Sequence, residues 1–283
     1  MLKKIVYMLL VFAVALILNG CDSGAYSAEK RFWHASKAYN KLMKASEKAT
    51  QVDYQKVIDS FREITIRYPM WLNSAQAQFN IGQLYAMQGN LSKAKDEFGV
   101  ILKDHFGNVD MCARGLFMIA LIHEREDNWP KAREALDKIT DSYPDTDTAF
   151  QVPIHIAEYY KIKGRNAEAE AAYSAALDKY KKAIKDNPKT YGAIVTVDLI
   201  VTCYVDQEKW NEALDYLSGL VSDYSDTLLA PKAMFIKGAI YEQKLSQPDK
   251  ARELYREIMQ KYSKTPFAKA AQQQIEGLNK PKK

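Results

Sequence analysis

Few residues of this sequence have the types and spacing that catalysis or metal binding needs. The 283 residues include three cysteines and four histidines, and they contain no CxxC pair and no cluster at metal-ligand spacing. Neither GxSxG nor HExxH occurs, and no glycine-rich loop joins a strand pattern to a helix pattern. We therefore expect a protein that is not an enzyme and that uses no cofactor, no metal ion and no small-molecule substrate.

Cys21 has the clearest chemical setting, because it ends a hydrophobic segment near the N-terminus. Two lysines precede an apolar run from Ile5 to Leu18, and its 14 residues are fewer than the roughly 20 that a membrane-spanning helix needs. This layout predicts a cleaved export signal over 1–20. The four residues ending at Cys21 resemble the bacterial lipobox, in which the cysteine is acylated and becomes the new N-terminus. An ordinary signal that is cut nearby is the alternative.

The residues that follow Cys21 bear on where the chain is anchored. They are small and polar, and they predict a flexible, lipidated tether over 21–30. The lipobox resemblance implies contact with a membrane through the Cys21 lipid. Asp22 follows directly, and in enterobacterial sorting an aspartate there resembles the signal for retention in the inner membrane. We expect a lipid-anchored cell-envelope protein that faces the periplasm, with the choice between outer and inner membrane left open.

Charge and the remaining cysteines exclude further classes of function. The formal net charge of +5 is small and evenly spread, so we expect no nucleic-acid partner. Cys112 and Cys203 lie far apart in the sequence, which predicts two small buried residues on helices rather than a disulfide framework.

Beyond residue 30 the chain repeats a helical pattern. An alanine-like residue is followed four and seven positions later by two more residues, mostly large and apolar, which places the three on one helix face. The first members of the six triplets are separated by 37, 38, 37, 44 and 38 residues. The triplets are Val57/Phe61/Ile64, Ala94/Phe98/Ile101, Ala132/Leu136/Ile139, Ala169/Tyr173/Ala176, Ala213/Leu217/Leu220 and Ala251/Tyr255/Ile258. A helical extension before Pro188 accounts for the step of 44 and lengthens the fourth helix by about two turns.

A second helix precedes five of these triplets. It carries a small or apolar residue with an aromatic-type residue three positions later, and small residues allow two helices to approach closely. The pairs are Gly82/Tyr85, Ala120/His123, Ala157/Tyr160, Val201/Tyr204 and Gly238/Tyr241. Each unit is therefore predicted to be a helix hairpin, with His123 as a packed core residue.

The hairpin pattern resembles the tetratricopeptide repeat. Residues 80–102 and 238–259 carry the small, tyrosine, turn, alanine and aromatic positions of that motif in order. In the first segment they are Gly82, Tyr85, Gly89, Ala94 and Phe98. The resemblance implies an all-α fold, a right-handed α-solenoid of about six tetratricopeptide-like hairpins over 31–264, the first and fourth degenerate. A closing helix and basic tail follow over 265–283, with Thr265 as N-cap and Pro266 at N1.

In tetratricopeptide repeats the first helices of the hairpins line a concave groove. The resemblance implies groove positions three and six residues before the small residue, and these include Gln76 and Asp198. The candidate partner-binding residues are Phe79, Phe117, Phe235, Arg114 and Lys232. Aromatic burial and charge pairing at these positions would hold an extended or helical peptide segment. The alternative is that the aromatic rings pack against neighbouring helices of the protein itself.

An exported, lipid-anchored chain of such repeats resembles the BamD-like outer-membrane assembly lipoproteins and the repeat domain of the Tol-Pal-associated periplasmic protein. The resemblance implies a non-enzymatic scaffold for protein–protein interaction in cell-envelope or outer-membrane protein assembly. Envelope proteins or peptide segments would occupy its groove. Two alternatives stay open: a structural subunit or pilotin of a secretion or pilus machine, bound through the convex surface, and an adaptor of cell-wall hydrolases.

Overall fold

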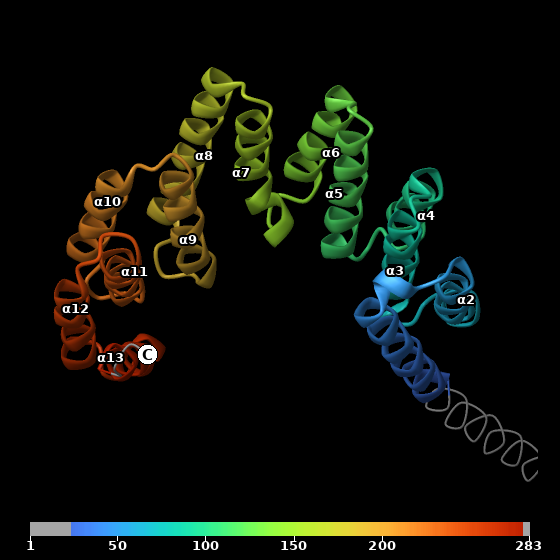
Figure 1. Ribbon diagram of the computed structural model, residues 1–283, viewed down its shortest axis with the longest axis horizontal. Helices are drawn as coiled ribbons and strands as arrows, with labels where there is room; N and C mark the ends of the chain where they lie inside the picture. Colours follow the sequence, from blue (N-terminus) through green and yellow to red (C-terminus); the bar gives the residue numbers. More distant parts are fainter. Residues whose placement is uncertain (1–23, 280–283) are drawn as a thin grey trace, which may run out of the picture. The chain divides into compact units, whose positions relative to one another are not determined.

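The structure, a computed structural model, describes residues 24–279, and this part of the chain is α-helical with no strand (Figure 1). A helix over 24–44 and the short 3₁₀ helix η1 (Ser46–Lys48) come first. The helices that follow are α2 (Gln51–Arg67), α3 (Ser74–Met87), α4 (Leu91–Asp104), α5 (Val109–Arg125), α6 (Trp129–Ser142), α7 (Asp147–Ile162), α8 (Asn166–Asp186), α9 (Tyr191–Asp206), α10 (Trp210–Asp223), α11 (Leu229–Gln243), α12 (Pro248–Lys261) and α13 (Pro266–Leu278).

The described helices follow one another as six hairpins and a closing helix. Helix 24–44, α3, α5, α7, α9 and α11 are the first helices of the hairpins, α2 and the remaining even-numbered helices are the second ones, and α13 ends the series. The chain divides into two compact units, one that runs to Phe150 and one that starts at Gln151, within α7. We call them unit 1 and unit 2. The predicted all-α fold of repeated hairpins is confirmed.

The predicted triplets form the buried face of the second helices. In α4, Ala94, Phe98 and Ile101 are fully buried, and every member of the other five triplets is at most 6% exposed. The small residue of the first helix lies directly against this face, because a Cβ atom added at Gly82 would lie 2.6 Å from the Phe98 ring. A Cβ at Gly238 would lie 2.5 Å from the Tyr255 ring. In these two hairpins the small residue therefore lets the first helix pack directly on the large residue of the second.

The start of the folded body differs from the predicted tether over 21–30. Residues 24–30 belong to the first helix, where Ala28 is fully buried and the hydroxyls of Ser27 and Tyr68 lie 2.9 Å apart. Small and polar residues look like a tether in composition, but here alanine and serine allow the helix to pack closely on the end of α2. The predicted lipidation and sorting residues, Cys21 and Asp22, lie outside the described residues.

Two further predictions concern the length of α8 and the start of α13. Helix α8 spans 21 residues, whereas α6 and α10 span 14 each, which agrees with the extension inferred from the position of Pro188. Helix α13 begins at Pro266 after Thr265. The Thr265 hydroxyl donates to the Tyr262 carbonyl at 2.8 Å and makes no bond to the helix N-terminus, so this side chain closes the preceding turn instead of capping α13.

Candidate binding surfaces

The first helices of unit 1 build a surface on which neighbouring hairpins touch. Helices α3 and α5 are in contact, and the Arg114 guanidinium lies 4.5 Å from the centroid of the Phe79 ring. Arg114 Nη1 also donates to Gln76 Oε1 at 3.3 Å. Phe79 itself is only 3% exposed and packs on Phe98, with ring centroids 5.3 Å apart. Phe79 is thus part of the core, and Arg114 is the exposed group above it.

The same relation between hairpins recurs in unit 2. Lys232 on α11 holds the repeat position of Arg114, six residues before the small residue, and Asp198 on α9 holds that of Phe79. Lys232 Nζ and the Asp198 carboxylate lie 2.8 Å apart. A cation six residues before the small residue therefore contacts the residue three before it in the preceding hairpin. Sequence inspection missed this pairing, although separations of 35 and 34 residues, close to one repeat, signal it.

The remaining predicted groove residues are only partly exposed. Phe235 is half-buried, and its ring packs on Tyr255 and Phe267 with centroid distances of 5.5 and 6.5 Å. Phe117 is also half-buried on α5. The structure thus joins Phe79 to Arg114 in unit 1 and places Phe235 and Lys232 on one helix in unit 2. A groove shared by all five residues stays a prediction.

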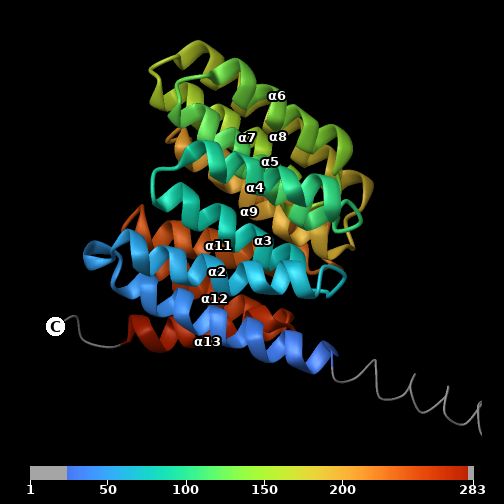
Figure 2. The ribbon, with the colours of Figure 1, turned by 90° about the vertical axis from the view of Figure 1, so that its right-hand side faces the viewer.

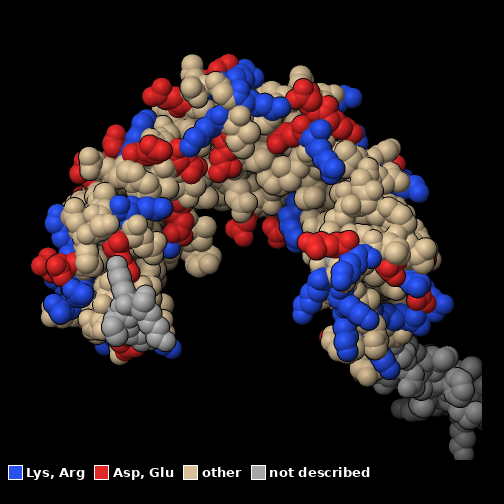
Figure 3. All heavy atoms as spheres, in the orientation of Figure 1, with Lys and Arg blue, Asp and Glu red and all other residues tan. Residues whose placement is uncertain are grey.

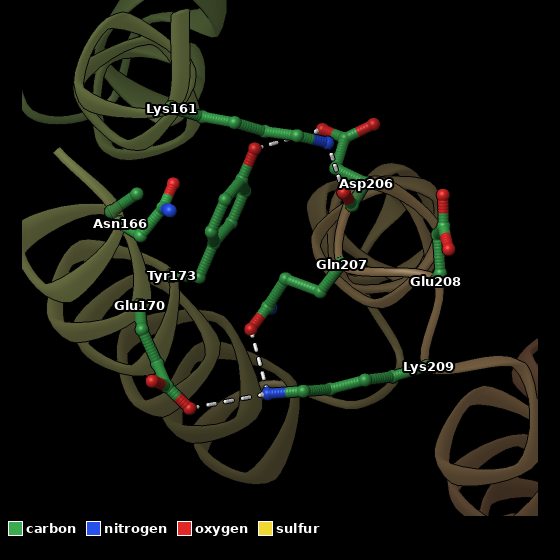
Figure 4. A pocket seen from close by; sticks show the side chains of 9 residues that line it. Lys161, Asn166, Glu170, Tyr173, Asp206, Gln207, Glu208 and Lys209 are labelled. Atoms are coloured by element: carbon green, nitrogen blue, oxygen red, sulfur yellow. Dashed lines mark hydrogen bonds and ion pairs between the residues drawn. The ribbon is translucent and has the colours of Figure 1, made fainter. Parts of the chain in front are cut away.

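Unit 2 contains a polar hollow of about 310 Å³ beside α7, α8 and the turn before α10 (Figure 4). The Tyr173 hydroxyl lies 3.4 Å from the Asp206 carboxylate, and Lys161 Nζ donates to the Asp206 carbonyl. Lys209 Nζ lies 3.8 Å from the Glu170 carboxylate. Burial, assisted by the nearby Asp206 charge, raises the pKa of the Tyr173 hydroxyl. The polar groups named here are engaged with one another, which disfavours a ligand that needs them.

Two kinds of site are absent from the part of the chain that the structure describes. Between residues 24 and 279, no group of three or more His, Cys, Asp or Glu side chains is placed to hold a metal ion. No helix in that range combines the length and the apolar character that crossing a bilayer requires. Cys112 and Cys203 are buried and form no disulfide, and burial raises the pKa of the Cys203 thiol to about 12.

Comparison with protein families identifies the repeats. The tetratricopeptide repeat model matches residues 76–105, 114–146 and 232–265, which cover most of the hairpins α3–α4, α5–α6 and α11–α12. The chain is therefore an all-α solenoid that contains tetratricopeptide repeats. Such repeats are scaffolds for protein–protein interaction and bind protein partners or peptides.

Comparison with solved structures finds similar chains at low sequence identity. BtubC (BKLC) from P. vanneervenii is 14% identical over 75% of this chain and 89% of its own, with a TM-score of 0.42. The human IFIT1 dimer with m7Gppp-AAAA is 14% identical over 94% of this chain and 56% of its own, with a TM-score of 0.41. Pseudomonas aeruginosa pilF is 12% identical over 89% of this chain and 99% of its own, with a TM-score of 0.41. No curated protein matches the sequence. Similarity of this degree carries no conclusion about function.

Proposed function

We propose that this protein is a lipid-anchored, non-enzymatic scaffold that binds protein partners in the bacterial cell envelope. The tetratricopeptide repeats support the scaffold role, and the lipobox-like sequence that ends at Cys21 supports the anchor and the location. The observation that carries the proposal is the exposed Arg114 guanidinium, which lies above the buried Phe79 ring on the first-helix surface of unit 1.

The surroundings of Arg114 indicate the chemistry of the partner. An arginine has five N–H donors in a planar fork, and one Arg114 nitrogen donates to the Gln76 amide oxygen at 3.3 Å. A partner carboxylate would accept from the guanidinium in a bidentate, charge-assisted pair. Lys232 is less suited to this role, because its side chain is only 17% exposed and already pairs with Asp198. We therefore expect an acidic peptide segment to bind next to Arg114.

Crosslinking in intact cells tests this binding surface. A photoreactive residue at Gln76 should capture a partner, and Arg114→Glu should abolish that capture through charge repulsion. Lys138→Glu is the matched control, since Lys138 is an exposed cation on the second helix α6, and it should leave capture unchanged. Loss of capture with Lys138→Glu but not with Arg114→Glu would contradict the proposal. It would favour a structural subunit bound through its second helices.

Membrane fractionation of the same cells tests the anchor. Cys21→Ser should release the chain from the membrane fraction, because acylation supplies the membrane affinity. Asp22→Ser should shift the protein between inner and outer membrane fractions if Asp22 acts as the retention signal. An unchanged distribution would show that Asp22 has no sorting role in this protein.

A further inference from the structure

Unit 1 exposes large apolar side chains at the turns that join its hairpins. Met70 and Leu72 in the α2–α3 turn are 94% and 81% exposed, and Phe106 in the α4–α5 turn is 75% exposed. With the half-exposed Val109 they flank one hollow of about 570 Å³. We call Met70, Leu72, Phe106 and Val109 the apolar end. A contiguous apolar cluster on a water-soluble surface marks a place that another molecule or a membrane covers.

The first helix begins at this same end of unit 1. The Ser27 hydroxyl lies 2.9 Å from the hydroxyl of Tyr68, which directly precedes the α2–α3 turn. The Phe32 ring packs on Trp71, which lines the hollow, with centroids 5.4 Å apart. In Figure 2, the start of this helix and the α2–α3 and α4–α5 turns lie at one end of unit 1.

The position of the chain start brings the predicted lipid close to the apolar end. Cys21 lies three residues before Gly24, the first helical residue of the described chain. Three residues span at most about 10 Å when fully extended. An acyl chain on Cys21 therefore holds the bilayer surface within reach of the α2–α3 turn, which follows Tyr68.

We propose that the apolar end inserts into the bilayer interface beside the Cys21 lipid, so that unit 1 stands on the membrane through its hairpin turns. This inference rests on the lipid anchor of the proposed function. Asp104 and Asp110 also line the hollow, and their charge disfavours anionic headgroups. The composition of the apolar end thus fits a zwitterionic lipid surface, in which Met, Leu and Phe side chains leave water.

A lysine-rich face of the first helix offers the competing orientation. Lys30, Lys37, Lys41 and Lys44 are exposed and recur at helical spacing with the exposed Trp33, and Lys and Arg side chains gather along this helix (Figure 3). A helix that lies flat on anionic lipid would use this face. Exposed lysines are ordinary on a solvated helix, whereas the exposure of Met70 and Leu72 needs an explanation. The observations therefore favour the apolar end.

Depth measurement on the acylated full-length chain tests the insertion. The chain is reconstituted on phosphatidylcholine vesicles, and an environment-sensitive fluorophore is attached through Met70→Cys. The control is Val52→Cys. Val52 is 61% exposed and lies in the first turn of α2, about 24 Å along the helix from Tyr68 at the other end. Cys112 and Cys203 are buried and acylation occupies Cys21, so the label is specific. We expect quenching by brominated lipid at position 70 and none at position 52.

The outcomes separate the inference from the proposed function. If the protein binds vesicles but the label at position 70 is not quenched, the insertion is wrong and the anchor stands. Stronger quenching of a label at Lys41→Cys than at Met70→Cys leads to the same conclusion. Failure to bind vesicles overturns the anchor. A second variant, Met70→Ser with Leu72→Ser and Phe106→Ser, should lower the vesicle partition coefficient at least about tenfold, because less apolar area is buried. The control Val52→Ser with Met87→Ser should leave it unchanged, and an equal loss in both variants also overturns the insertion.

Discussion

The polar hollow of unit 2 and the apolar end of unit 1 are both formed by the ends of neighbouring helices, yet they differ in which side chains line them. In unit 2 the hollow is walled by Tyr173, a core residue that is 1% exposed. Beside it Lys209 pairs with Glu170, and Lys161 donates to the backbone carbonyl of Asp206. In unit 1 the hollow is walled by Met70 and Phe106, which are mostly exposed to solvent.

This difference separates two kinds of position in a repeat, the inner helix faces and the turns. Residues on the inner helix faces must fill the space between helices, so their exposure is near zero in both units. Turn residues such as Met70 and Phe106 stay mostly exposed, so the same architecture presents apolar side chains at one place and bonded polar groups at another. Exposed apolar side chains in a turn therefore indicate a binding surface more strongly than the presence of a hollow does.

Truncating a side chain that lines each hollow should give the largest difference in stability between the two regions. Tyr173→Ala should lower the free energy of unfolding of unit 2 by about 3–5 kcal/mol, because it leaves a cavity in the core. Met70→Ser should change that of unit 1 by less than about 0.5 kcal/mol, since an exposed turn residue contributes little. Denaturant unfolding followed by circular dichroism measures both. A large loss with Met70→Ser would show that the apolar end is a structural element.

Replacing glycine by alanine in each region should give a difference in stability of intermediate size. A Cβ at Gly238 would lie 2.5 Å from the Tyr255 ring, whereas a Cβ at Gly107, beside the apolar end, meets nothing within 4 Å. Gly238→Ala should cost about 1–3 kcal/mol through overpacking, and Gly107→Ala should be neutral or slightly stabilising because it restricts the unfolded chain. Thermal unfolding of both variants checks this. Equal effects would contradict the assignment of Gly238 to a close helix contact.

The smallest effect should come from a carboxylate beside the polar hollow. Burial, reinforced by the Asp206 charge and opposed by His155 and Lys161, raises the pKa of Glu158 in the folded protein. Ionised Glu158 therefore costs stability, and this cost grows as the pH rises from the unfolded-state pKa through the folded-state pKa. Glu158→Gln should stabilise unit 2 at pH 7 by less than about 1 kcal/mol. The gain should vanish near pH 4, and a gain that persists there would contradict this cause.

The repeat pattern was predictable because packing between helices constrains residue size at regular intervals. The six triplets, the small residues such as Gly82 and the extended α8 all follow from spacing alone, and the structure agrees. The tether over 21–30 was not predictable in the same way. Its small residues carry no periodic signal, and only the structure shows that residues 24–30 are helical and contact Tyr68, the residue directly after α2.

The side-chain pairings between hairpins depend on which helices become neighbours. Arg114 and Phe79 were predicted to contact a partner together. In the structure the exposed Arg114 lies over the buried Phe79 ring, while Lys232 contacts Asp198. The sequence predicts on which face of its helix each residue lies, but it does not identify the residue that it contacts on the next hairpin.

The hydrophobic pattern therefore sets the helices, their pairing into hairpins and the buried positions, since burial of apolar area depends on spacing within each helix. Tertiary packing sets which charges neutralise one another and which apolar turns are left exposed. That outcome depends on distances between residues about one repeat apart, and those distances exist only after the hairpins have stacked.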